Sequence, residues 1–151
     1  MAGADQDSPL GSAVTEAANR AEVTALLIIC GYRVYRSEAD IDGEDLVVMA
    51  PGRHLRRAQL KGRPYVEWKR YGGRDLWMLF PSTPWRHDTA RAWFLVPHDP
   101  FFAWVKARHG HTPKWGEQWN YPMTGKDLAA YLAGWALRLP SGKISPPEIS
   151  N

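Results

Sequence analysis

The sequence predicts a mixed α/β domain arranged around a small sheet, and three observations support this fold class. An apolar pattern with helical spacing opens the chain, short apolar stretches with strand-like character follow, and two more helical stretches close it. With 151 residues, of which 44% are apolar and 23% charged, the chain has the length and composition of one soluble globular domain with a real core.

The first predicted element is a helix from about Ser12 to Ile29, and Gly31 provides the left-handed residue that ends it. Its core-facing stripe is mostly apolar, but Glu22 lies on the same stripe. A carboxylate in that place costs free energy unless a cation or a hydrogen-bond donor meets it. We therefore consider Glu22 a candidate functional acid, against the alternative of a solvated helix residue.

Three strands are predicted after this helix, each bounded by a turn or a breaker. A Pro-Gly turn at 51–52 separates the second from the third, and Pro64 ends the third. The strands span Tyr32–Arg36, Leu46–Met49 after an opening Asp45, and His54–Arg63.

The second half of the chain predicts a hairpin, one more strand and two helices. The hairpin joins Tyr65–Trp68 to Asp75–Phe80, and the last strand follows at Arg91–Pro97. An Asp-Pro start leads into the helix Phe101–Arg108. A Trp-rich loop at 114–123 comes next, and a capping box at Thr124–Asp127 opens a last helix that reaches about Leu139.

Cysteine content and terminal composition bear on where the protein works. The single Cys30 excludes an internal disulfide and indicates a reducing compartment. The first residues lack the features of a secretory signal, and the longest apolar run, Ala25–Cys30, is too short to span a bilayer. We expect a soluble cytoplasmic protein with one domain at 12–139, between disordered segments at 1–11 and 140–151.

Charged side chains are distributed unevenly. Residues 38–45 contain five acids and no base, whereas residues 52–74 contain eight Lys or Arg and one acid. An acidic cluster beside a basic stripe suits a cation site next to a polyanion such as DNA. A solvated hairpin with a charged edge is the alternative. The basic side chains expected to contact nucleic acid are Arg57, Arg63, Lys69, Arg70 and Arg74.

Two of the predicted strands bring polar side chains together. Residues two apart in a strand share a face, so Gln59 and Lys61 project together, with Asp45 at the start of the neighbouring strand. If the first helix packs nearby, Glu22 joins them. Phosphodiester hydrolysis needs such a set, because oxygen ligands hold Mg²⁺ or Mn²⁺ and a lysine orients the attacking water or neutralises developing charge.

This order of residues resembles the PD-(D/E)XK nuclease superfamily. The pattern is a helix with Glu22, the stretch Cys-Gly-Tyr-Arg-Val-Tyr-Arg, then Asp45, and then Gln59-Leu60-Lys61. The helix-Gly-aromatic-Val stretch is similar to archaeal Holliday junction resolvases, and Gln-x-Lys is similar to group I intron-associated endonucleases. The resemblance covers about residues 16–98 and implies a restriction-endonuclease-like mixed sheet flanked by helices.

The resemblance also implies roles for individual residues. Asp45 is the central metal ligand, Gln59 a second, the Leu60 carbonyl a third, Lys61 the catalytic lysine, and Glu22 the helix acid. The chain departs from the family pattern at two places. No proline precedes Asp45, and Gln59 stands where the family has an acid, which removes one negative charge from the site.

The sequence therefore predicts a Mg²⁺-dependent endonuclease acting on DNA. A homodimer suits a chain that must cut two strands with one site. Three alternatives remain at this point. The first is a structure-selective resolvase of the Holliday junction type, and the second is a catalytically silent nucleic-acid-binding protein of the same fold. The third is an interaction protein that docks a partner through its Trp-rich part.

Overall fold

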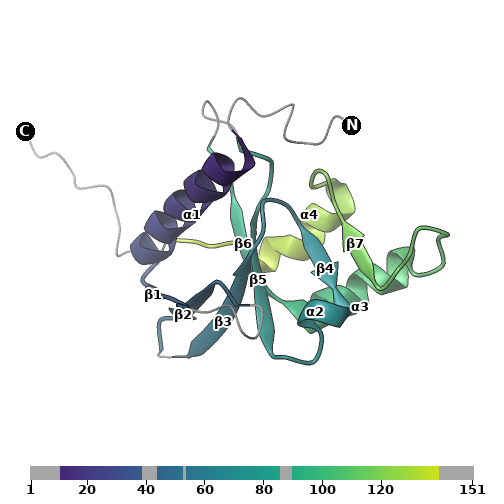
Figure 1. Cartoon of the computed structure of the whole chain (residues 1–151), viewed down its shortest axis with the longest axis horizontal. Helices are drawn as coiled ribbons and strands as arrows, with labels where there is room; N and C mark the ends of the chain where they lie inside the picture. Colours follow the sequence, from purple (N-terminus) through teal and green to yellow (C-terminus); the bar gives the residue numbers. More distant parts are fainter. Residues whose placement is uncertain (1–10, 39–43, 53, 86–89, 140–151) are drawn as a thin grey trace, which may run out of the picture.

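The computed structural model describes residues 11–38, 44–52, 54–85 and 90–139 (Figure 1). The disorder predicted for 1–11 and 140–151 falls, except for Gly11, outside these residues. Within the described ranges, none of the helices has the length and apolar character needed to cross a membrane.

A five-stranded mixed sheet forms the centre of the molecule, which confirms the predicted mixed α/β fold class. Its strand order is β1-β2-β3-β5-β6. Strands β1 and β3 each run antiparallel to β2, β5 runs parallel to β3, and β6 runs antiparallel to β5. Their bounds are Arg33–Arg36, Leu46–Met49, Leu55–Leu60, Leu76–Pro81 and Trp93–Pro97.

The two faces of this sheet are covered by different helices (Figure 1). Helix α1 (Ser12–Ile29) packs Val23 and Leu27 on one face, against alternate residues of β2 and β3 such as Leu46 and Ala58. The opposite face carries a second core, to which α3 (His98–His109) and α4 (Lys126–Leu132) contribute. Because side chains alternate along a strand, Gln59 and Lys61 belong to the α3 side.

The predicted hairpin at 65–80 is wrong. Strand β4 (Tyr65–Glu67) pairs with β7 (Gln118–Asn120), which lies in the segment predicted as a Trp-rich loop. Residues Trp68–Tyr71 form the short helix α2. Five of the six residues of β5 are buried, and burial on both faces is typical of a central strand rather than a hairpin arm.

Three helix boundaries also differ from the prediction. Asp99 is not the N-cap of α3, because the helix begins at His98 and Pro97 is its N-cap. The Asp99 Oδ1 lies 2.8 Å from His98 Nδ1, and its Oδ2 accepts a hydrogen bond from Gly73 N. The capping box at Thr124 does not form, since α4 begins after Gly125 without a side-chain cap. The last helix ends at Leu132 and a 3₁₀ turn, η2, follows at Ala133–Trp135. The chain then bridges to β6.

Candidate functional site

Asp45 connects the start of β2 to the end of β3. Its backbone N–H donates to the Ala58 carbonyl at 2.8 Å, and its Oδ2 accepts from Leu60 N at 3.1 Å and from Gln59 Nε2 at 2.9 Å. The structure therefore brings together three of the residues singled out in the sequence: Asp45, Gln59 and Leu60. Hydrogen bonds to a carboxylate are stronger than neutral ones, so this junction also holds the two strands in register.

The Gln59 side chain has an orientation that its neighbours determine. A carboxylate only accepts, so the amide nitrogen must face Asp45, and the same nitrogen lies 3.4 Å from the Leu60 carbonyl. The Gln59 side-chain oxygen faces elsewhere, is buried, and has no hydrogen-bond partner among the described residues. Leaving a buried polar atom unsatisfied costs about 1–3 kcal/mol.

These residues can be tested against the divalent cation that the resemblance implies. The Asp45 carboxylate, the Leu60 carbonyl and the Gln59 amide oxygen are hard oxygen donors of the kind that Mg²⁺ prefers. The amide nitrogen of Gln59 bonds two of them, as a cation placed there would. The set therefore fits a hard cation when the amide turns its buried, unsatisfied oxygen toward the other two ligands.

The site has few acids. Among the residues that the structure describes, no group of three or more His, Cys, Asp or Glu side chains is arranged to hold a metal ion. Glu44, which precedes Asp45, has a buried carboxylate oxygen without a hydrogen-bond partner in the same described part of the chain. One carboxylate with neutral oxygens gives less charge compensation than two carboxylates, so the expected affinity for a cation is low.

Lys61 follows β3 on the same face as Gln59. Its ammonium lies 5.2 Å from the centre of the Tyr65 ring and 5.6 Å from that of Tyr71, within the range of cation–π attraction. The Tyr65 hydroxyl donates to Glu67 Oε1 at 2.7 Å. Burial, and after it this hydrogen bond, raises the pKa of Tyr65, so the phenol stays neutral.

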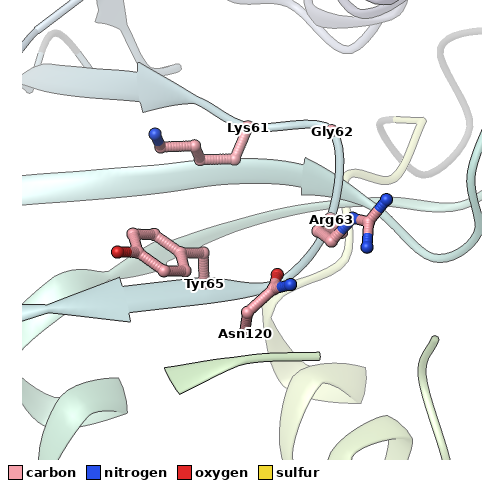
Figure 2. Close-up of a pocket in the computed structure, with 5 residues that line it drawn as sticks. All are labelled: Lys61, Gly62, Arg63, Tyr65 and Asn120. Carbon is pink, nitrogen blue, oxygen red and sulfur yellow. The ribbon is translucent and has the colours of Figure 1, made fainter. Parts of the chain in front are cut away.

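A pocket of about 300 Å³ opens beside Lys61. Figure 2 shows Lys61 and Arg63 extending in opposite directions from the turn at Gly62, with Tyr65 and Asn120 beneath them. The pocket is therefore formed where the end of β3 meets the small β4–β7 sheet, in which Tyr65 and Asn120 are paired across the strands.

Glu22 makes its contacts elsewhere. Its Oε1 lies 2.8 Å from the Arg91 guanidinium, and its Oε2 accepts from Trp93 Nε1 at 2.5 Å. Arg91, whose side chain is fully buried, also donates to Asn19 Oδ1 at 2.6 Å and to the Thr83 carbonyl at 3.0 Å. The acid on the apolar stripe is thus met by a cation and a donor, as its position required.

The sheet separates Glu22 from the Gln59 side chain. Helix α1 and the Trp93 side chain belong to the core on one face, while Gln59 and Lys61 project from the other. The recorded hydrogen bonds of Glu22 are structural in kind, since they tie α1 to β6. The structure thus joins Asp45, Gln59 and Leu60, has Lys61 directly after the same strand, and gives Glu22 its own partners.

The basic residues expected to contact nucleic acid lie on β3, on α2 and in the segments that follow these two elements. The Arg57 guanidinium donates to the Arg74 carbonyl, which places these two residues side by side. Arg70 lies with its guanidinium carbon 5.2 Å from the Tyr71 ring, the same ring that Lys61 approaches. Lys69 is exposed on α2, and Arg63 lines the pocket.

Several residues of the site were not found by reading the sequence. Asn120 joins Tyr65 and Tyr71 near Lys61 because β4 pairs with β7. These two strands are far apart in sequence, with 53 positions between the contacting residues Tyr65 and Gln118. Arg91 was predicted as a strand residue and is instead the counter-charge of Glu22. Glu22 on the apolar stripe of α1 was a signal that a cation or a hydrogen-bond donor lies next to it, although the signal did not identify which residue.

His109, at the end of α3, is partly enclosed by aromatic side chains. Its ring stacks on Trp119 with 4.1 Å between centroids, and its Nε2 lies 3.0 Å from the Tyr121 hydroxyl. Burial lowers the pKa of His109 and raises the pKa of Tyr121 to about 12. These contacts make the Trp-rich segment a packed part of the domain.

His98 provides a pH-dependent element of stability. Its side chain is fully buried, its Nε2 accepts from Glu67 N at 3.1 Å, and burial lowers its pKa. Protonation is thus easier in the unfolded chain, so the free energy of unfolding should fall as the pH drops below about 6.5, the ordinary pKa of histidine.

Urea unfolding between pH 7.5 and 5.5 checks this prediction. The free energy of unfolding should depend less on pH in His98→Gln than in wild type, whereas His54→Gln, at an exposed position, should keep the wild-type pH dependence. Equal slopes in wild type and His98→Gln would contradict the prediction.

Comparisons of the chain with protein-family models, with curated proteins and with solved structures found no match.

Proposed function

We propose that this protein is a metal-dependent endonuclease that hydrolyses phosphodiester bonds in DNA. The observation that carries the proposal is the junction of Asp45, Gln59 and the Leu60 backbone, with Lys61 directly after the same strand. A hard-oxygen set beside a lysine is the arrangement that phosphodiester hydrolysis requires. The mixed sheet flanked by helices is compatible with the restriction-endonuclease-like fold that the sequence resembles.

A bound Mg²⁺ or Mn²⁺ would supply Lewis acidity at the phosphate and a bound water of lowered pKa. Asp45, the Leu60 carbonyl and Gln59 would hold it. The residues of the chain have their own tasks. The Tyr65 and Tyr71 rings contact the Lys61 ammonium, which would stabilise negative charge that develops on the phosphate oxygens. The Asp45 hydrogen bond to Leu60 N keeps the strand ends in place during this step.

DNA is the proposed substrate because cations surround the site. Arg63, Lys69, Arg70, Arg74 and Arg57 all lie on or next to the elements that carry Lys61, Tyr65 and Tyr71. Phosphate contacts by Lys and Arg supply most of the sequence-independent affinity for DNA. The same proposal includes a homodimer, in which each chain cuts one strand. It also includes the variant in which the substrate is a branched DNA such as a Holliday junction rather than linear DNA.

One observation favours a second candidate, a nucleic-acid-binding protein that does not cut. The Gln59 amide nitrogen already satisfies Asp45 and approaches the Leu60 carbonyl without any cation. A site that has lost its metal would benefit from such a neutral replacement. Cutting and binding must therefore be measured separately.

Lys61 provides the direct test. Supercoiled plasmid, linear duplex and a four-way junction are incubated with the protein in Mg²⁺, in Mn²⁺ or in EDTA. We expect divalent-dependent cutting that Lys61→Met reduces about a hundredfold, because the charge next to the phosphate is lost while side-chain length is kept. Lys126→Met, at the exposed start of α4, should cut like the wild type.

The outcomes separate the two candidates. Binding of DNA by wild type in every buffer, without cutting in Mg²⁺ or Mn²⁺, would replace the enzyme by the binding protein. Cutting that survives EDTA, or that Lys61→Met leaves unchanged, would contradict the proposed site.

A further inference from the structure

The pocket next to Lys61 has the features of a site for an anion. Lys61 and Arg63 are two of its five lining residues, and none of the five is acidic. Glu67, the acid nearest to Tyr65 in the recorded contacts, is turned to the Tyr65 hydroxyl. The pocket therefore has a lysine and an arginine in its lining, which leave the turn at Gly62 in opposite directions, and no lining carboxylate to neutralise them.

The polar groups of the pocket are available to a ligand. In the described ranges, Arg63 forms no recorded ion pair or hydrogen bond, and the Asn120 side chain has no recorded hydrogen bond either. The Tyr65 hydroxyl is already used by Glu67, so this residue offers its ring rather than its oxygen. Arginine presents a planar fork of N–H donors, and an asparagine amide adds two more, which suits the oxygens of a phosphate.

The size and place of the pocket fit a phosphate group on a polymer. A volume of about 300 Å³ equals roughly ten water molecules at the density of the liquid, enough for a phosphate with part of its hydration. Lys61 lines this pocket and comes directly after β3, the strand that carries Gln59. A nucleic-acid strand whose phosphate is bound in the pocket would therefore continue toward Asp45.

We propose that the pocket between Lys61, Arg63 and Asn120 binds a phosphate group of a nucleic-acid strand and thereby anchors that strand beside the Asp45 site. The proposal rests on the proposed function for its substrate, but it concerns binding and does not require cutting. Arg63 and Asn120 are positioning residues in it. The phosphate is either an internal phosphodiester or a terminal phosphate, and both present the same oxygens.

Binding is measured in EDTA, with the full chain and fluorescein-labelled single-stranded oligonucleotides that carry a 5′-phosphate or a 5′-hydroxyl. We expect Arg63→Gln to weaken binding about tenfold and to lower the slope of log K against log salt by about one, because one phosphate contact is lost. Asn120→Asp should weaken binding as well, since it puts a carboxylate into the pocket at nearly constant shape. Lys126→Gln is the matched control and should behave as wild type.

Inorganic phosphate alone gives a second measurement. In an NMR titration of the ¹⁵N-labelled protein at constant ionic strength, the Asn120 side-chain amide and the Gly62 N–H should shift in wild type and stay in place in Arg63→Gln. This spectrum also reports whether each variant is folded.

Each outcome bears on the proposal. A 5′-phosphate preference that disappears in Arg63→Gln indicates a terminal phosphate, and equal losses for both oligonucleotides indicate an internal one. Unchanged affinity and salt slope in Arg63→Gln and Asn120→Asp would overturn the pocket as a phosphate site, even if the protein cuts DNA. Loss of binding in these variants of a protein that never cuts would leave the pocket supported and remove the proposed enzyme.

Discussion

Asp45→Asn is expected to reduce divalent-dependent plasmid cutting by about a thousandfold or more while the domain stays folded. Asp45 is the only carboxylate in the junction with Gln59 and Leu60 among the contacts that the structure describes. An asparagine oxygen in the place of Oδ2 can still accept from both donors, but the negative charge that would hold a cation is gone. Plasmid cleavage and circular dichroism of the same preparation check the prediction.

Asp127→Asn is the matched control for this charge. Asp127 is exposed and pairs with Arg108 at 3.1 Å, a surface contact of small energetic value. The Asp127→Asn variant should cut plasmid at the wild-type rate. Asp45→Asn that cuts like wild type would show that Asp45 serves only to join β2 and β3.

Arg91→Met is expected to lower the free energy of unfolding by about 3–5 kcal/mol, because it leaves Glu22 partly buried without its counter-charge. It also removes the hydrogen bonds that Arg91 donates to Asn19 and Thr83. For a domain of this size the loss corresponds to a fall in Tm of roughly 10 °C. Urea and thermal unfolding measure both quantities.

Arg20→Met gives the comparison for Arg91. Arg20 pairs with Glu16 at 3.2 Å on the same helix, but the Glu16 carboxylate is largely exposed. Losing this ion pair should therefore lower the free energy of unfolding by less than about 1 kcal/mol. The double variant Arg91→Met with Glu22→Gln should recover part of the loss, because no unpaired charge remains. If Arg91→Met and Arg20→Met are equally mild, the buried pair does not stabilise the fold.

The sequence by itself was sufficient for features that depend on near neighbours. Gly31 ends α1 with a φ of 94°, a conformation that glycine adopts without strain. Strand alternation predicted that Gln59 and Lys61 share one face, and the structure has the intervening Ala58 and Leu60 in the core beneath α1. The expectation that Asp45 meets Gln59 followed from two short strands joined by a turn, and the 2.9 Å contact agrees with it.

Only the tertiary structure decided the features that depend on distant segments. The pairing of β4 with β7, the insertion of β5 between β3 and β6, and the partner of Glu22 each join parts of the chain far apart in sequence. Local patterns assign a residue to a face of its own strand or helix, but they do not say which other element covers that face. Glu22 shows the difference. Its place on an apolar stripe demanded a partner, and the segment that leads into β6 supplied Arg91.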